Sequence, residues 1–232
     1  MSPRIQNIFA PKSSRILRVL LVNVSEEWNE REIASIANVS GGMAHYVCKT
    51  LIELGYLARN ESNHIVLIDP LRLLKRWAAY HQYDNANKFL DYHTFEREAE
   101  KVLQNFAELD LEYAATVLTG AWLVAPYVRP VDLHFYAPNK ETADKIAEKL
   151  DLNPVPRSGN IKFVIPFDEG VFYGNREVKG VKVISNIQLY VDLYNYPARG
   201  EEAASRLLDE ILKEWHREKK SILKTGRPQK MA

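Results

Sequence analysis

Hydrophobic residues recur at helical spacing along the N-terminal part of the chain. An apolar run at residues 16–24 predicts a first helix, and residues 29–37 predict a short amphipathic helix that Asn29 can cap. After a tight turn, a third helix is predicted over residues 40–54, and Gly55 ends it. Three helices separated by short breaks indicate a compact helical unit.

Two short extended segments follow the third helix. Residues 56–59 and 64–68 predict strands, and the polar segment 60–63 between them predicts the turn of a hairpin. Helix, helix, turn, helix and hairpin, in this order, predict a winged helix-turn-helix. The third helix of that motif typically enters the DNA major groove. We therefore predict that the N-terminal part of the chain binds double-stranded DNA.

The third predicted helix separates its side chains onto two faces. Its apolar residues recur at helical intervals, which predicts one buried face made of Ala44, Val47, Cys48, Leu51 and Leu54. The helix start and the opposite face then supply the candidates for DNA contact, which are Ser40, Gly42, Met43, His45, Tyr46 and Lys49. Histidine, tyrosine and lysine can bind base edges or phosphates, and first-turn glycines let a phosphate approach the backbone. The alternative is a solvent-exposed face with a frayed helix start.

The predicted hairpin adds a second group of candidates for DNA contact. Arg59 enters the hairpin, and three polar residues surround its tip, namely Asn60, Asn63 and His64. In a winged helix these positions lie near the DNA backbone or the minor groove. We predict that they contact DNA there.

The remainder of the chain mixes helices with strands, which indicates an α+β or α/β domain. Helices are predicted over residues 70–83, 94–106, 139–150, 185–194 and 200–217, strands over 131–136 and 161–167, and a hairpin over 171–173 and 177–183 around Gly174-Asn175. Residues 131–136 alternate with period two. This alternation predicts a half-buried strand whose polar face shows Asp132, His134 and Tyr136.

Charge and composition narrow the classes of function. Residues 1–76 hold ten Lys/Arg against seven Asp/Glu, residues 77–212 hold fourteen against twenty-one, and residues 213–232 hold seven against two. Basic ends on an acidic body fit contact with nucleic acid, although such a small excess at the N-terminus is also ordinary scatter. With no membrane-spanning stretch and no secretory signal, we expect a cytoplasmic protein without membrane contact. The one cysteine, Cys48, excludes an internal disulfide and is expected to be buried.

Two short segments resemble the nucleotidyltransferase fold. That fold places a Gly-Ser or Gly-Gly turn about ten residues before an Asp-x-Asp strand. The same spacing separates Leu118-Thr119-Gly120-Ala121 from Asp132-Leu133-His134. The two carboxylates of such a strand hold Mg²⁺. Here His134 replaces the second carboxylate, and a hard cation prefers oxygen ligands. The resemblance therefore implies a degenerate site at Gly120, Asp132 and His134, with no catalytic residue, no metal and no cofactor.

A winged helix joined to such a domain resembles the AbiEi-type antitoxins, the transcriptional regulators of type IV toxin–antitoxin systems. The segments 183–194 and 197–204 are similar to the C-terminal helix pair of that family. The resemblance implies a DNA-binding repressor of its own operon whose second domain counteracts a toxin. It also makes Gln188, Asp192 and Arg199 functional candidates. Their alternative role is structural, as polar residues on a helix surface and as a cap near a turn.

The predicted fold class is therefore α+β, with an N-terminal winged helix-turn-helix followed by a nucleotidyltransferase-like α/β domain. The expected boundaries are 1–82 for the DNA-binding domain, 83–217 for the second domain and 218–232 for a basic tail. The tail is expected to be disordered from Lys219. Its Gly226-Arg227-Pro228 resembles a minimal AT-hook, which binds the A·T minor groove, while a solubilising tail is the alternative.

Three hypotheses remain for the function. The first is a sequence-specific regulator that binds operator DNA, as a homodimer if it reads paired half-sites, with a toxin as the second partner. The second is an active nucleotidyltransferase in which Asp168 or Glu169 joins Asp132. The third makes the winged helix a protein-interaction module, for which Trp28 and Tyr46 are available.

Overall fold

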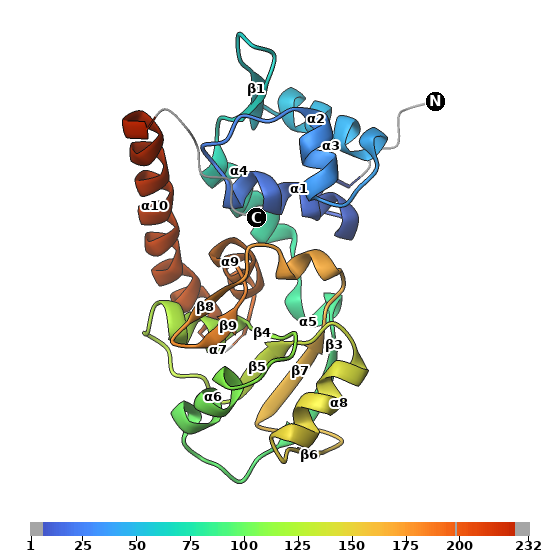
Figure 1. Cartoon of the computed structure of the whole chain (residues 1–232), viewed down its shortest axis with the longest axis vertical. Coiled ribbons are helices and arrows are strands. Elements are labelled where there is room, and N and C mark those ends of the chain that lie inside the picture. The colour runs from blue at the N-terminus through green and yellow to red at the C-terminus, as the bar shows by residue number, and fades with distance from the viewer. Residues whose placement is uncertain (1–6, 198, 226–232) are drawn as a thin grey trace. The chain divides into compact units, whose positions relative to one another are not determined.

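The computed structural model describes residues 7–197 and 199–225, and it mixes helices with β-strands. The chain divides into two compact units (Figure 1). Unit 1 contains the described residues up to Tyr80 and from Ile211 onward, and unit 2 contains His81–Glu210. Within the described residues, no helix is long and apolar enough to cross a membrane.

Unit 1 contains the predicted succession of helices and strands. Its elements are α1 (Pro11–Val22), α2 (Glu30–Ile36), α3 (Gly41–Glu53), β1 (Leu57–Arg59), β2 (Ile65–Leu67), α4 (Pro70–Tyr80) and the last part of α10 (Gly200–Thr225). The strands β1 and β2 pair antiparallel, with Leu57 opposite Leu67. The predicted helix over 70–83 ends at Tyr80, and residues 83–86 form the separate short helix α5.

Local side-chain bonds fix where α2 and α3 begin. The Asn29 side chain accepts hydrogen bonds from two amides of the first turn of α2, and Glu32 accepts one from the Asn29 amide, which makes a capping box. Ser40 caps α3 by accepting from the Met43 amide at 3.3 Å. Gly55, with a φ of +74°, ends that helix in the left-handed conformation. The sequence predicted all three boundaries.

The core of unit 1 is built from α1, α2 and α3, which pack against one another. The predicted apolar face of α3 is buried at Ala44, Val47, Cys48 and Leu51, and Leu54 is half-buried at the end of the helix. Burial and, to a smaller extent, the nearby Glu30 carboxylate raise the pKa of the Cys48 thiol to about 12. Cys48 is therefore a small core residue, as predicted.

The end of α10 completes unit 1. The indole Nε1 of Trp215 donates to the Leu21 carbonyl at 3.1 Å, and Glu218 accepts a hydrogen bond from the Ser25 amide at 3.4 Å. The division between the two units therefore falls within α10, between Glu210 and Ile211, and not between residues 217 and 218 as expected. The expectation of disorder from Lys219 is wrong as far as Thr225, because α10 continues to that residue. Gly226-Arg227-Pro228 lies outside the described residues.

Unit 2 is organised around one mixed sheet, whose described strands run in the order β6-β3-β7-β5-β4-β9-β8. The strands are β3 (Lys88–His93), β4 (Ala114–Ala115), β5 (Leu133–Tyr136), β6 (Asn153–Pro154), β7 (Ile161–Ile165), β8 (Arg176–Val178) and β9 (Val181–Val183). The helices are α5 (Tyr83–Ala86), α6 (Ala99–Ala107), α7 (Val117–Val124), α8 (Lys140–Lys149), α9 (Asn186–Tyr194), the start of α10 and the 3₁₀ turn η1 (Glu169–Phe172). The pairs β5–β7 and β4–β9 are parallel, and the other pairs are antiparallel.

The strand β5 corrects the prediction of a half-buried strand. All four of its residues are buried, because both of its faces are covered. Phe135 stacks on Phe106 of α6 with ring centroids 3.7 Å apart, and on the other face His134 and Tyr136 meet side chains of α5 and α9. The alternation of β5 therefore separates an apolar buried face from a polar buried face.

Two further predictions in unit 2 are wrong. The helix expected from residue 94 begins at Ala99, and residues 88–93 before it form β3, which was not predicted. The expected hairpin turn at Gly174-Asn175 lies instead at Lys179-Gly180, between β8 and β9. Both turn residues have positive φ, 52° and 82°, which suits the tight two-residue turn of a β-hairpin.

Replacing Trp215 with alanine should destabilise unit 1 by about 3 kcal/mol or more, since it empties a large buried volume and leaves the Leu21 carbonyl without its donor. Urea unfolding measures the change. Trp215→Phe should lose less, because most of the packing remains. The exposed neighbour His216→Ala is the control, and an equal loss in that variant would contradict the role of Trp215.

Candidate functional site

The residues predicted to contact DNA all lie on unit 1, in the α3 segment and in the hairpin of β1 and β2, and we call them the α3–hairpin face. They are Ser40, Gly42, Met43, His45, Tyr46 and Lys49 of the α3 segment, and Arg59, Asn60, Asn63 and His64 of the hairpin. Gly42, His45 and Lys49 are exposed, while Met43 and Tyr46 are half-buried. The burial of the opposite side of α3 is what turns these residues outward.

The hairpin residues bind one another as well as facing solvent. The Asn60 side chain accepts from the His64 amide at 2.9 Å, and Arg59 donates through Nη1 to the Asn63 carbonyl at 3.1 Å. Asn63 adopts a φ of 62°, which asparagine tolerates better than most residues. Asn60 and Asn63 therefore shape the turn.

Two glutamates that sequence reasoning missed join this face. One Glu30 oxygen lies 2.5 Å from Nη2 of Arg59, and the other lies 3.0 Å from Nδ1 of His45. Glu27 accepts from the Asn60 side chain at 2.8 Å and lies 3.7 Å from Nδ1 of His64. No local pattern signals these pairings, because Glu30 alone resembles an ordinary acidic residue in a first helical turn.

The contacts of Glu30 with His45 and Arg59 affect its pKa. Partial burial raises the pKa of Glu30, but hydrogen bonds from His45 and Arg59 and the charges of both partners outweigh it. The pKa of Glu30 therefore lies below its usual range. Glu30 is a carboxylate at neutral pH, and it places a negative charge between two residues predicted to contact DNA.

Gly120, predicted from the resemblance to nucleotidyltransferases, lies inside α7 and is buried. A Cβ atom there would come within 2.9 Å of Leu189 Cδ1 and 3.1 Å of the Ala115 carbonyl oxygen. Close packing of α7 on α9 and on the end of β4 therefore accounts for glycine at this position.

Asp132 precedes β5 and lies near a lysine. Nζ of Lys162 is 3.9 Å from the Asp132 carboxylate and 2.6 Å from that of Asp91. Lys162 stands opposite Asp91 on β3 and opposite His134 on β5. The ammonium group of Lys162 thus supplies the positive charge beside both carboxylates.

His134 is buried and bonded on both sides of its ring. Nδ1 lies 3.2 Å from the Tyr83 hydroxyl and Nε2 lies 3.5 Å from the Tyr196 hydroxyl. Burial and, to a smaller extent, the charge of Lys162 lower the pKa of His134 to about 3, so the ring is neutral at physiological pH. These residues do not fit Mg²⁺, which requires several oxygen ligands. No group of three or more metal-binding side chains occurs among the described residues.

A buried polar network surrounds Asp192 of α9, whose side chain is fully buried. The carboxyl group accepts hydrogen bonds from Thr116 at 2.7 Å, Tyr136 at 3.1 Å and Gln188 at 2.7 Å. Nε2 of His81 lies 3.2 Å from the same group. Gln188 and Asp192 are therefore interior residues, and their placement on a helix surface is wrong. Arg199 is exposed and pairs with Glu202 at 2.6 Å.

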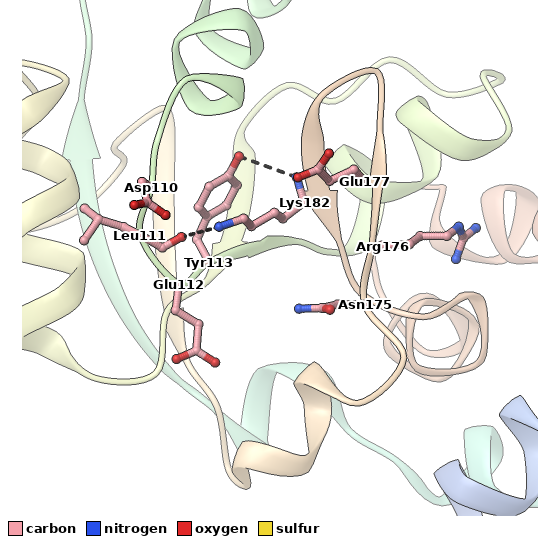
Figure 2. A pocket seen from close by; sticks show the side chains of 8 residues that line it. All are labelled: Asp110, Leu111, Glu112, Tyr113, Asn175, Arg176, Glu177 and Lys182. Atoms are coloured by element: carbon pink, nitrogen blue, oxygen red, sulfur yellow. Dashed lines mark hydrogen bonds between the residues drawn. The ribbon is translucent and has the colours of Figure 1, made fainter. Parts of the chain in front are cut away.

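Unit 2 also has an open pocket of about 440 Å³ between residues 110–113 and the β8–β9 hairpin (Figure 2). It is lined by Asp110, Leu111, Glu112, Tyr113, Asn175, Arg176, Glu177 and Lys182. Lys182 extends past the Tyr113 ring and donates to the Leu111 carbonyl at 2.9 Å. None of these residues was predicted to line a pocket. They come from segments that are distant in the sequence, and only the pairing of strands in the sheet brings them close together.

The chain matches one family model, described as a transcriptional regulator, AbiEi antitoxin, of type IV toxin–antitoxin systems. The match covers residues 66–213, which is more than half of the chain. The chain belongs to this family. No curated protein and no solved structure matches it.

Membership of the AbiEi antitoxin family confirms the resemblance predicted from the sequence. The matched range contains the Asp192 network and the three positions, Gly120, Asp132 and His134, that were predicted from the resemblance to nucleotidyltransferases. It begins within β2, so α1, α2, α3 and β1 lie outside it. All ten residues of the α3–hairpin face therefore lie outside the matched range.

Asp192→Asn should destabilise unit 2 by about 3 kcal/mol, because an amide nitrogen would replace one acceptor and face side chains that already donate. Denaturant unfolding of the full chain measures this loss. Asp209→Asn makes the same change at an exposed position of α10 and should leave stability unchanged. Equal stability of the two variants would show that the Asp192 network is not a structural centre.

Proposed function

We propose that this AbiEi-family regulator is a sequence-specific DNA-binding repressor of its own operon, and that unit 1 acts as its winged helix-turn-helix. One observation carries the proposal. The capped helix α3 buries its apolar face and turns His45 and Lys49 outward. It is followed by a two-stranded hairpin that carries Arg59, Asn60 and His64 around its turn. This succession matches the way in which such motifs present a recognition helix and a wing.

The start of α3 supports the proposal through its glycines. An added Cβ at Gly41 or Gly42 would meet no atom within 4 Å. The folded chain therefore does not require glycine at either position, although glycine weakens a helix. A close approach of DNA phosphate to the first-turn amides explains why the space is left open.

Basic side chains of unit 1 supply charge for phosphate contacts. Lys49 of α3 is exposed, as are Arg72, Lys75 and Arg76 of α4. Arg72 lies over the ring of buried Tyr56 at 4.9 Å, which limits its motion. Phosphate contacts position a protein on DNA, while base contacts by α3 would select the sequence. We expect two copies of the chain to bind paired half-sites.

For unit 2 we propose the antitoxin role, acting against a toxin in the cytoplasm. Its match to the family supports this assignment. An active nucleotidyltransferase has less support, since His134 is enclosed by Tyr83 and Tyr196 and Lys162 lies beside Asp132. The burial of His134 supports a structural role for this residue.

DNA binding is tested with the full chain, on DNA from upstream of its own gene and on a scrambled duplex at two salt concentrations. We expect tight, selective binding that weakens with salt, since phosphate contacts release counterions. A Tyr46→Ala, Lys49→Ala double variant should lose selective binding. Lys149→Ala, which removes one charge from an exposed site of unit 2, is the control. Equal, weak binding of the wild-type chain to both duplexes would overturn the proposal.

Gly42→Ala should change stability and DNA affinity in opposite directions. Alanine favours the helix by up to about 1 kcal/mol, and it meets nothing in the folded chain. The methyl group would nevertheless obstruct a phosphate at the first turn of α3. Thermal unfolding and DNA titration measure the two effects. Unchanged DNA affinity in this variant would show that the start of α3 does not approach DNA.

A further inference from the structure

We propose that Glu30 is a positioning residue that sets the sequence selectivity of the α3–hairpin face. It holds a helix residue and a wing residue in one arrangement and keeps both from binding phosphate indiscriminately. This inference rests on the DNA-binding function proposed above. Glu27 assists at the hairpin tip.

The geometry ties three segments to one carboxylate. Glu30 belongs to the first turn of α2, where the capping box fixes the backbone. Its two oxygens bind different partners, Arg59 at the end of β1 and His45 of α3. Arg59 in turn holds the Asn63 carbonyl through its other terminal nitrogen. A single carboxylate therefore holds the side chains of His45 on α3 and Arg59 on the hairpin.

Glu27 repeats the arrangement one step farther along the hairpin. Trp28 forms an isolated β-bridge with Ile65, with N–H to carbonyl distances of 2.9 and 2.7 Å in the two directions. This bridge lays the segment before α2 beside β2. It brings the Glu27 carboxylate to Asn60 and His64. Three of the ten residues on the α3–hairpin face, His45, Arg59 and Asn60, are thus hydrogen-bonded to these two carboxylates, and His64 lies 3.7 Å from one of them.

A carboxylate among phosphate-binding side chains has a predictable effect. It repels the DNA backbone, and it occupies the guanidinium group that would otherwise pair with any phosphate. Binding to an arbitrary sequence must break the Arg59–Glu30 pair or accept the repulsion. A DNA sequence whose base edges match the fixed positions of His45 and Arg59 gains contacts that offset the repulsion by Glu30. Selectivity then comes partly from penalising the wrong DNA.

Two variants separate the charge of Glu30 from its reach. Glu30→Gln removes the negative charge at nearly constant size. Glu30→Asp keeps the charge but is too short to hold both partners. Glu61→Gln removes one charge from an exposed position at the hairpin tip and serves as the matched control. Each full-length variant is titrated with the upstream duplex and the scrambled duplex over a range of salt.

Glu30→Gln should raise affinity for the scrambled duplex about fivefold, the scale of one exposed ion pair. Its slope of log affinity against log salt should steepen by about 0.9, as for one more neutralised phosphate. The ratio of upstream to scrambled affinity should fall severalfold. Glu30→Asp should lower the same ratio without steepening the slope, because charge is retained while positioning is lost. Glu61→Gln should leave the ratio unchanged.

The contrary results are distinct. If Glu30→Gln and Glu61→Gln change affinity and slope alike, only bulk charge matters and the positioning role is overturned. If Glu30→Asp keeps the wild-type ratio, the bridging contact does not set selectivity. If the wild-type chain itself shows no selective binding, the proposed function fails first and this inference fails with it. Thermal unfolding of each variant confirms that the compared proteins are folded.

Discussion

The α3 helix buries Ala44, Val47, Cys48 and Leu51 against α1 and α2, and this burial decides which side chains of α3 meet solvent. Each fully buried Val or Leu contributes about 1.5–3 kcal/mol, so rotation of the helix about its axis would be costly. With α3 held in this way, Glu30 reaches His45 and Arg59. The proposed recognition surface is thus a consequence of core packing, refined by two carboxylates.

Unit 2 has a cluster of hydrogen-bonded polar residues in its interior. The Asp192 network joins α9 to the start of α7 and to β5, while Lys162 lies beside Asp91 and Asp132. The carboxylates of Asp91, Asp132 and Asp192 therefore contact side chains of the same unit. A buried carboxyl group with three hydrogen bonds and a nearby imidazole tolerates little rearrangement.

The sequence was sufficient where helical spacing and helix caps determine the structure. Helical spacing predicted the buried face of α3, and Asn29, Ser40, Asn139 and Ser185 marked helix starts that their side chains do cap. It failed where distant segments decide. Alternation in β5 could not distinguish exposed polar side chains from buried ones that find partners on α5 and α9. The Glu30 pairs likewise depend on how α2, α3 and β1 assemble. The family resemblance was confirmed over residues 66–213.

The most direct test of the DNA-binding account is amide hydrogen exchange of the full chain, with and without the duplex from upstream of its own gene. If the α3–hairpin face contacts DNA, the amides of residues 40–49 and 59–64 should exchange more slowly when the duplex is bound. Residues 81–210 should exchange at their original rates. Protection confined to unit 2, or no protection at concentrations that saturate binding, would contradict the central claim that the α3–hairpin face contacts DNA.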